Sequence, residues 1–160
     1  MFTSIAIIGR PNVGKSTLFN KLTKTREAIV SDFPGLTKDR NYGYIKLGSI
    51  KSFIIDTGGI GKDESNLSQN ISEQAWMAAN ECNLILFLVD GSENLTSEDF
   101  DILSSLRKLN KPFVTLLNKS DKTSKSEALN DISSKGIKDY LDISAEHSRG
   151  LDDLKKLLIK

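Results

Sequence analysis

The sequence predicts an α/β domain in which helices cover both faces of a six-stranded, mostly parallel sheet. Continuous apolar runs such as Ile5–Ile8 and Leu84–Val89 are typical of strands that are buried on both faces. Segments with apolar residues at three- and four-residue spacing lie between these runs and indicate amphipathic helices. Strands that alternate with helices in this way favour a parallel sheet between two helical layers.

The individual elements follow from local patterns. Tyr44–Leu47 and Ser52–Ile55 flank Gly48 and Ser49, which predicts a hairpin and hence one antiparallel edge strand. Further strands are expected at residues 5–8, 84–89, 112–117 and 140–143. Two helices are expected at 17–22 and 68–82. A third begins after a capping box formed by Thr96 and Asp99, and a fourth begins at a cap formed by Ser124 and Glu127 and ends near Gly136. The last helix has one apolar face, made of Leu151, Leu154, Leu157 and Leu158.

Size and composition restrict the class of protein. The chain of 160 residues predicts one domain, residues 1–160, and we expect it to be an excised domain of a longer protein. Its formal charge of +1 argues against strong nucleic-acid binding by this domain alone. The single cysteine, Cys82, suits a reducing compartment, and no apolar run approaches membrane-spanning length, so we expect a cytoplasmic protein without a membrane partner.

The residues from Gly9 to Ser16 predict a phosphate-binding loop. They fit the pattern G-x-x-x-x-G-K-S/T directly after an apolar strand and before a helix. The glycines let backbone N–H groups approach a polyphosphate, Lys15 reaches the outer phosphates, and the Ser16 hydroxyl is placed to bind Mg²⁺. The expected phosphate contacts are Gly9, Arg10, Pro11, Asn12, Val13, Gly14, Lys15, Ser16 and Thr17.

A second motif follows the strand at Ser52–Ile55. Asp56 is the expected acidic partner of Mg²⁺, through a water molecule, and the Gly59 N–H is free of side-chain obstruction toward a terminal phosphate. Because ligands bind at the carboxyl ends of strands in such sheets, this motif and the phosphate loop should meet. The expected contacts are Asp56, Thr57, Gly58, Gly59 and Ile60.

The residues from Asn118 to Asp121 predict guanine as the base. The Asp121 carboxylate can accept two parallel hydrogen bonds from guanine, and adenine offers no such donor pair. The stem of Lys119 can lie along the base, and Asn118 is better placed to tie loops together. Ala145 N–H is expected to reach the guanine carbonyl oxygen. The expected base contacts are Asn118, Lys119, Ser120, Asp121, Ser144, Ala145 and Glu146, for GTP or GDP.

Four stretches together resemble the Der (EngA) family, and specifically its first GTPase domain: residues 9–20, 32–40 with 42–43, 56–60 and 144–147. The resemblance implies a Ras-like P-loop GTPase fold, hydrolysis of GTP with Mg²⁺, and a switch that acts in assembly of the large (50S) ribosomal subunit. It also implies a second GTPase domain and a KH-like domain beyond this chain. Thr37 would bind Mg²⁺ and sense the γ-phosphate, so the implied catalytic set is Lys15, Thr37, Gly59 and Asn12.

The sequence departs from Ras-like enzymes where they orient the attacking water. Ile60 replaces the glutamine that follows their D-x-x-G motif, so slow hydrolysis is expected, whether Ile60 packs against the sheet or gates the site. No arginine finger can be assigned, and Arg10 is interpreted as a solvated loop residue. Related GTPases with asparagine at the place of Asn12 bind K⁺, which suggests K⁺ here, although asparagine is also common in tight loops for turn reasons. His147 is interpreted as a loop residue near the base.

Three alternatives remain open. The first is a nucleotide-responsive binding module whose hydrolysis is incidental. The second is a P-loop kinase or ATPase, which would need neither the stretch at 118–121 nor the one at 144–146. The third is a related GTPase of tRNA modification or another ribosome-assembly family, against which residues 34–40 favour Der.

Overall fold

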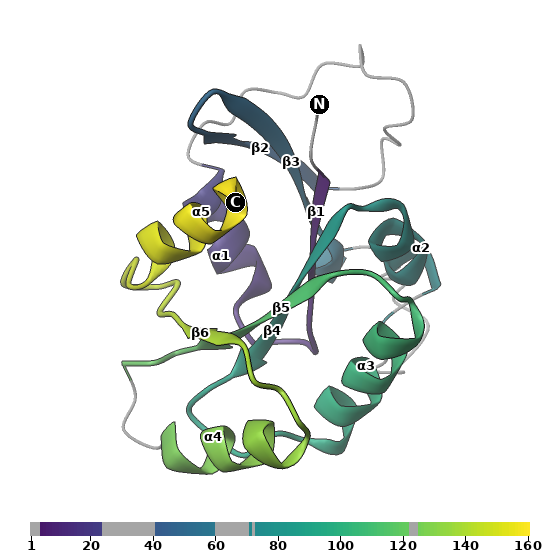
Figure 1. Ribbon diagram of the computed structural model, residues 1–160, viewed down its shortest axis with the longest axis vertical. Coiled ribbons are helices and arrows are strands. Elements are labelled where there is room, and N and C mark those ends of the chain that lie inside the picture. The colour runs from purple at the N-terminus through teal and green to yellow at the C-terminus, as the bar shows by residue number, and fades with distance from the viewer. Residues whose placement is uncertain (1–3, 24–40, 60–70, 72, 122–124) are drawn as a thin grey trace.

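A computed structural model describes residues 4–23, 41–59, 71, 73–121 and 125–160. Its single six-stranded sheet has the order β2-β3-β1-β4-β5-β6 (Figure 1). β2 pairs antiparallel with β3 and every other neighbouring pair is parallel, so the predicted sheet with one antiparallel edge strand is confirmed. The strands are β1 (Ser4–Ile8), β2 (Asn41–Leu47), β3 (Ile50–Asp56), β4 (Leu84–Asp90), β5 (Phe113–Asn118) and β6 (Tyr140–Asp142).

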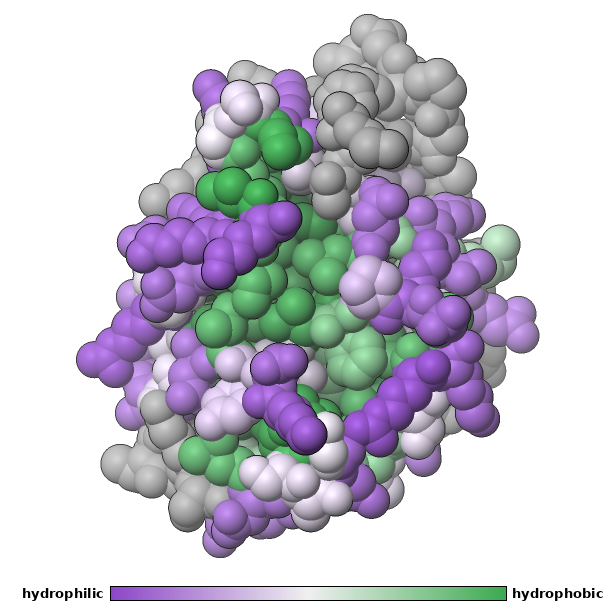
Figure 2. Space-filling view, in the orientation of Figure 1, coloured by the Kyte–Doolittle hydropathy of each residue, from purple (hydrophilic) through white to green (hydrophobic). Residues whose placement is uncertain are grey.

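Helices cover both faces of the sheet because successive strand residues point in opposite directions. Ile5 and Ile7 of β1 pack with the helices on one face, whereas Ala6 and Ile8 pack with those on the other. The first face carries α1 (Lys15–Leu22) and α5 (Leu151–Ile159), and the second carries α2 (Glu73–Glu81), α3 (Ser97–Lys108) and α4 (Lys125–Ser134). Figure 2 shows hydrophilic side chains along the outer helix surfaces and hydrophobic ones gathered between them.

Several element boundaries differ from the sequence expectation. The edge strand begins at Asn41 rather than Tyr44, because the backbone from Asn41 onward pairs with β3. Gly43 disfavours a strand by propensity, yet a side chain there would place its Cβ 2.4 Å from Thr23 Cγ2, so the close packing of α1 requires glycine. The second helix begins at Glu73, with Ile71 before it, and Ser68 lies outside the described residues.

The predicted capping box of α3 is confirmed. Thr96 Oγ1 accepts a hydrogen bond from Asp99 N at 3.3 Å, and Asp99 Oδ2 accepts one from Thr96 N at 2.9 Å. Ser124, the expected cap of α4, lies outside the described residues. Cys82 is buried in the core as expected. Within the described ranges, no helix has both the length and the apolar character needed to cross a bilayer.

Candidate functional site

The predicted motifs lie at one edge of the sheet, where the parallel strands end. The register aligns Ile7 of β1 with Asp56 at the end of β3, and Asp90 at the end of β4 with Asn118 at the end of β5. The topology therefore brings together residues that are far apart in the sequence, as expected for an open α/β sheet.

The loop between β1 and α1 is shaped by left-handed backbone at Asn12 (φ 67°) and Gly14 (φ 104°). A Cβ at Gly14 would lie 2.2 Å from Asn118 Nδ2, so glycine is required by both conformation and space. Lys15 is largely buried, and its Nζ donates to Gly9 O and Arg10 O at 2.8 Å each. The backbone carbonyls of the loop thus hold the Lys15 ammonium group on the concave side of the loop.

A cavity of about 420 Å³ adjoins this loop, which is the size of a small-molecule site. Its described lining comes from the phosphate loop, the turn after β3 and the loop after β5: Pro11, Asn12, Gly14, Lys15, Ser16, Thr17, Gly58 and Lys119. The lining contains both Lys15 and Lys119, so the cavity suits a negatively charged ligand.

Ser16 and Asp56 meet at the position expected for Mg²⁺. Ser16 Oγ donates to Asp56 Oδ2 at 2.9 Å, and the Asp56 carboxylate is buried. Its other oxygen, Oδ1, accepts from Gly58 N at 2.9 Å, and Thr57 Oγ1 anchors the same turn to Ile7 O at 2.6 Å. A hydroxyl and a carboxylate oxygen this close are the hard oxygen ligands that Mg²⁺ prefers, so these residues fit the ion.

Asn118 joins the phosphate loop to the loop after β6. Its Nδ2 donates to Val13 O at 2.8 Å, and its Oδ1 accepts from Ala145 N at 2.9 Å, with all three residues buried. The expected loop-tying role of Asn118 is confirmed by these contacts. The Ala145 N–H was expected to point to a guanine carbonyl, but in this structure it pairs with Asn118.

The Asp121 carboxylate lies against the loop after β6. Ser144 Oγ donates to Asp121 Oδ1 at 2.9 Å, and His147 Nε2 lies 3.3 Å from Asp121 Oδ2. Ser120 N donates to Ile143 O at 3.0 Å, which holds the two loops together. His147 therefore lies at the predicted base region, while Glu146 beside it is exposed.

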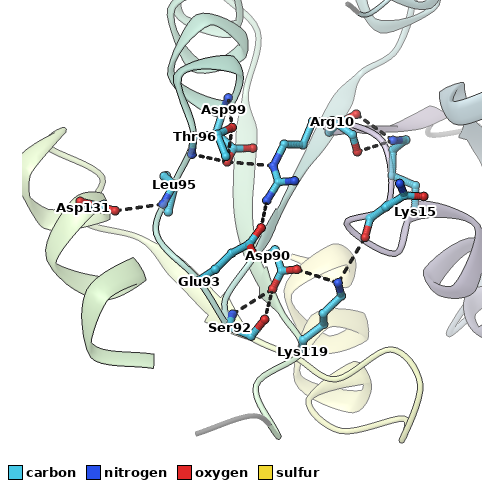
Figure 3. A network of polar contacts seen from close by, with 12 residues as sticks. Arg10, Lys15, Asp90, Ser92, Glu93, Leu95, Thr96, Asp99, Lys119 and Asp131 are labelled. Carbon is cyan, nitrogen blue, oxygen red and sulfur yellow. Dashed lines mark hydrogen bonds and ion pairs between the residues drawn. The ribbon is translucent and has the colours of Figure 1, made fainter. Parts of the chain in front are cut away.

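Lys119 makes a contact that the sequence reasoning missed. Its Nζ lies 2.6 Å from Asp90 Oδ2 and 3.2 Å from Asn12 O (Figure 3). Burial alone would raise the Asp90 pKa, but hydrogen bonds from Lys119 and Ser92 and the lysine charge outweigh burial and lower that pKa. The available signal was that Asp90 ends an apolar strand, as Asp56 does.

The interpretation of Arg10 as a solvated loop residue is wrong. Its side chain is only 15% exposed, it forms an ion pair with Glu93, and its Nε lies 3.2 Å from Asp99 Oδ2. Burial opposes the guanidinium charge, but hydrogen bonds and charges from Glu93 and Asp99 outweigh it and raise the pKa of Arg10. The arginine side chain therefore turns toward the start of α3 (Figure 3).

Part of the predicted catalytic set lies outside the described residues. This part is Thr37, and Ile60, expected to contact the nucleotide, also lies outside them. Gly59 ends the 3₁₀ turn at Thr57–Gly59, directly after Asp56. The roles of Thr37, Ile60 and Gly59 stay predictions.

The chain is similar in sequence to known proteins. The chain is 48% identical to GTPase Der of Legionella pneumophila (strain Lens) over 160 residues, which is the whole chain but 35% of that relative. It is 48% identical over 155 residues to GTPase Der of Xanthomonas campestris pv. campestris (strain B100), of which it covers 33%. The resemblance to Der is therefore confirmed, and the chain spans about a third of the length of these relatives.

The fold is shared with a solved GTPase structure. An Aquifex aeolicus Era variant bound to GDP and AlF4⁻ superposes with a TM-score of 0.78 at 31% identity, covering 99% of this chain and 56% of that one. The predicted Ras-like P-loop GTPase architecture is thereby confirmed. The model of the family described as "50S ribosome-binding GTPase" matches residues 4–119, which is more than half of the chain. The chain belongs to this family of 50S ribosome-binding GTPases.

Proposed function

We propose that this chain binds guanine nucleotides and hydrolyses GTP to GDP and phosphate as a molecular switch. The observation that carries the proposal is the bridge made by Asn118, which joins Val13 of the phosphate loop to Ala145 of the loop that supports Asp121. This bridge fixes the distance between a polyphosphate site and a carboxylate suited to guanine. On nucleotide binding, the Ala145 N–H would be shared between Asn118 Oδ1 and the guanine carbonyl oxygen, so the bridge would persist.

The described residues have separate roles in this reaction. Lys15 places a positive charge where charge spreads over the phosphates. Ser16 and Asp56 would hold Mg²⁺, which neutralises the developing phosphate charge when it is bound. Thr37 would complete the metal and γ-phosphate contacts, by resemblance to Der. Because the Ile60 side chain can neither donate nor accept a hydrogen bond, the attacking water lacks the glutamine contact, and hydrolysis by this domain is slow.

The cellular role extends beyond this domain. The Der relatives are about three times as long as the chain, and the family description names the 50S subunit. We place this domain at the N-terminus of a longer cytoplasmic protein, with a second GTPase domain and a KH-like domain. In that protein it acts in assembly of the large ribosomal subunit, and it makes no strong nucleic-acid contact by itself.

The test of guanine recognition is the substitution Asp121→Asn. The parent should bind GDP more tightly than ADP or xanthosine diphosphate, and the variant should shift toward xanthosine diphosphate, whose 2-oxo group pairs with an amide donor. Asp139→Asn, at an exposed position outside the site, is the matched control and should keep the parent's preference. Equal binding of ADP and GDP by the parent would contradict the proposal and favour the kinase or ATPase reading.

Potassium is proposed as a second cation, at Asn12. The left-handed backbone of Asn12 fits the turn explanation for this residue, so a variant must separate conformation from side chain. Asn12→Gly keeps that backbone accessible and removes the side-chain oxygen. The parent should hydrolyse GTP faster in K⁺ than in matched Na⁺ buffer, and Asn12→Gly should lose the difference. Equal parent rates in the two buffers would refute the potassium role.

A further inference from the structure

We propose that Arg10 is a positioning residue for the nucleotide phosphates, which acts through the carboxylates of Glu93 and Asp99. The proposal rests on the proposed function. It assigns a role to the segment between β4 and α3, which belongs to neither the phosphate motif nor the base motif. Figure 3 shows this segment beside the phosphate loop, with the Arg10 side chain reaching across to it.

The anchor for Arg10 is rigid. Asp99 is 1% exposed, and its Oδ2 accepts from Thr96 N at 2.9 Å as part of the capping box of α3. The same oxygen accepts from Arg10 Nε at 3.2 Å. Because the capping hydrogen bond already fixes the Asp99 carboxylate at the start of α3, this carboxylate holds the Arg10 side chain in place. Glu93, with a side chain 54% exposed, adds a second ion pair from the preceding loop.

The backbone of Arg10 carries this restraint to Lys15. Arg10 O and Gly9 O each accept from Lys15 Nζ at 2.8 Å. The next two residues, Pro11 and Asn12, are exposed, and the loop is buried again only at Val13. Arg10 therefore anchors one side of the exposed turn, as the Val13 contact with Asn118 anchors the other.

The direction of the Arg10 guanidinium group argues against a direct contact with the phosphates. Arg10 is not among the described residues that line the cavity, whereas Lys15 and Lys119 are. In this arrangement the charge of Arg10 is directed at two carboxylates and not at the phosphates, so Arg10 does not serve as an arginine finger. Its effect on the nucleotide passes through the loop carbonyl that holds Lys15.

The experiment compares Arg10→Gln with the parent in the full 160-residue chain. The variant should bind GDP about tenfold more weakly, mainly through faster release of a fluorescent GDP analogue, because network contacts of this kind couple sites by about that factor. Its preference for GDP over inosine diphosphate should stay within about twofold, because the contacts of Asp121 are untouched. A merely structural role would lower the free energy of unfolding and leave the GDP affinity of the folded fraction unchanged.

Two further variants make the test specific. Arg10→Lys should remain at least about threefold weaker than the parent, because one ammonium group cannot pair with both carboxylates as the guanidinium fork does. Glu93→Gln should weaken GDP binding about threefold alone and add nothing to Arg10→Gln, since both changes remove one shared contact. Lys156→Gln, which removes an exposed ion pair with Asp153 on α5, is the control and should match the parent.

The outcomes separate the two proposals. GDP affinity of Arg10→Gln within about twofold of the parent, when the parent prefers GDP to ADP, would overturn the role of Arg10 and leave the proposed function standing. A parent without preference for GDP would overturn both. If Arg10→Gln does not fold, Glu93→Gln decides by the same measurement, because its half-exposed side chain can be changed without opening the core, and unchanged binding would overturn the role.

Discussion

Replacing Asn118 by alanine should destabilise the fold as well as the site. The side chain makes two buried hydrogen bonds, to Val13 O at 2.8 Å and from Ala145 N at 2.9 Å. Alanine leaves both backbone groups without their partner, and each such loss costs about 1–3 kcal/mol. We therefore expect the free energy of unfolding to fall by about 4 kcal/mol, the middle of the summed range, and the melting temperature to fall by about 8–16 °C.

The assay is urea unfolding of the nucleotide-free chain, followed by GDP titration of the variant. Asn130→Ala is the matched control, because Asn130 is exposed on α4 and its replacement should change stability by less than about 0.5 kcal/mol. GDP affinity should fall as well, since the phosphate loop and the loop after β6 are no longer held at one separation. A loss of stability below about 1 kcal/mol would refute the reasoning, because it would mean that neither backbone group depends on Asn118.

Two further predictions follow from the same site. Gly14→Ala should weaken GDP binding about 100-fold, because its Cβ would lie 2.2 Å from Asn118 Nδ2 and displace the loop. Gly48→Ala is the matched control, because Gly48 also has a positive φ, 61°, but no atom lies within 4 Å of a Cβ placed there. Equal losses of GDP affinity in the two variants would point to backbone strain alone. The Asp90 pKa lies below its ordinary value of 3.8, so the stability that this carboxylate contributes is present above that pH and is lost as pH falls through the depressed pKa. Asp90→Asn should therefore be less stable than the parent at about pH 6 by urea unfolding, and the difference should shrink below pH 3.8; a difference independent of pH would contradict the charge pairing with Lys119.

The contacts of Arg10 show that the site includes residues outside the sequence motifs. Arg10 and Asp99 are 89 residues apart in the sequence, and Asp99 was predicted only as a helix cap. The capping prediction was correct because a cap depends on residues three apart. The second role of Asp99 depends on α3 starting beside the phosphate loop, which no local pattern specifies. The same holds for Asp90 and Lys119, which lie at the ends of neighbouring strands.

The sequence by itself determined the order of strands and helices along the chain and the antiparallel edge strand, and it predicted the residues of the phosphate and base motifs. These depend on periodicity, turn chemistry and short spacings, which are local properties of the chain. Only the tertiary structure decided that Arg10 turns to Asp99, that Lys119 pairs with Asp90, and that Asn118 holds the Ala145 N–H. Long polar side chains take their direction from partners that packing brings within hydrogen-bond distance, and that packing is a property of the whole fold.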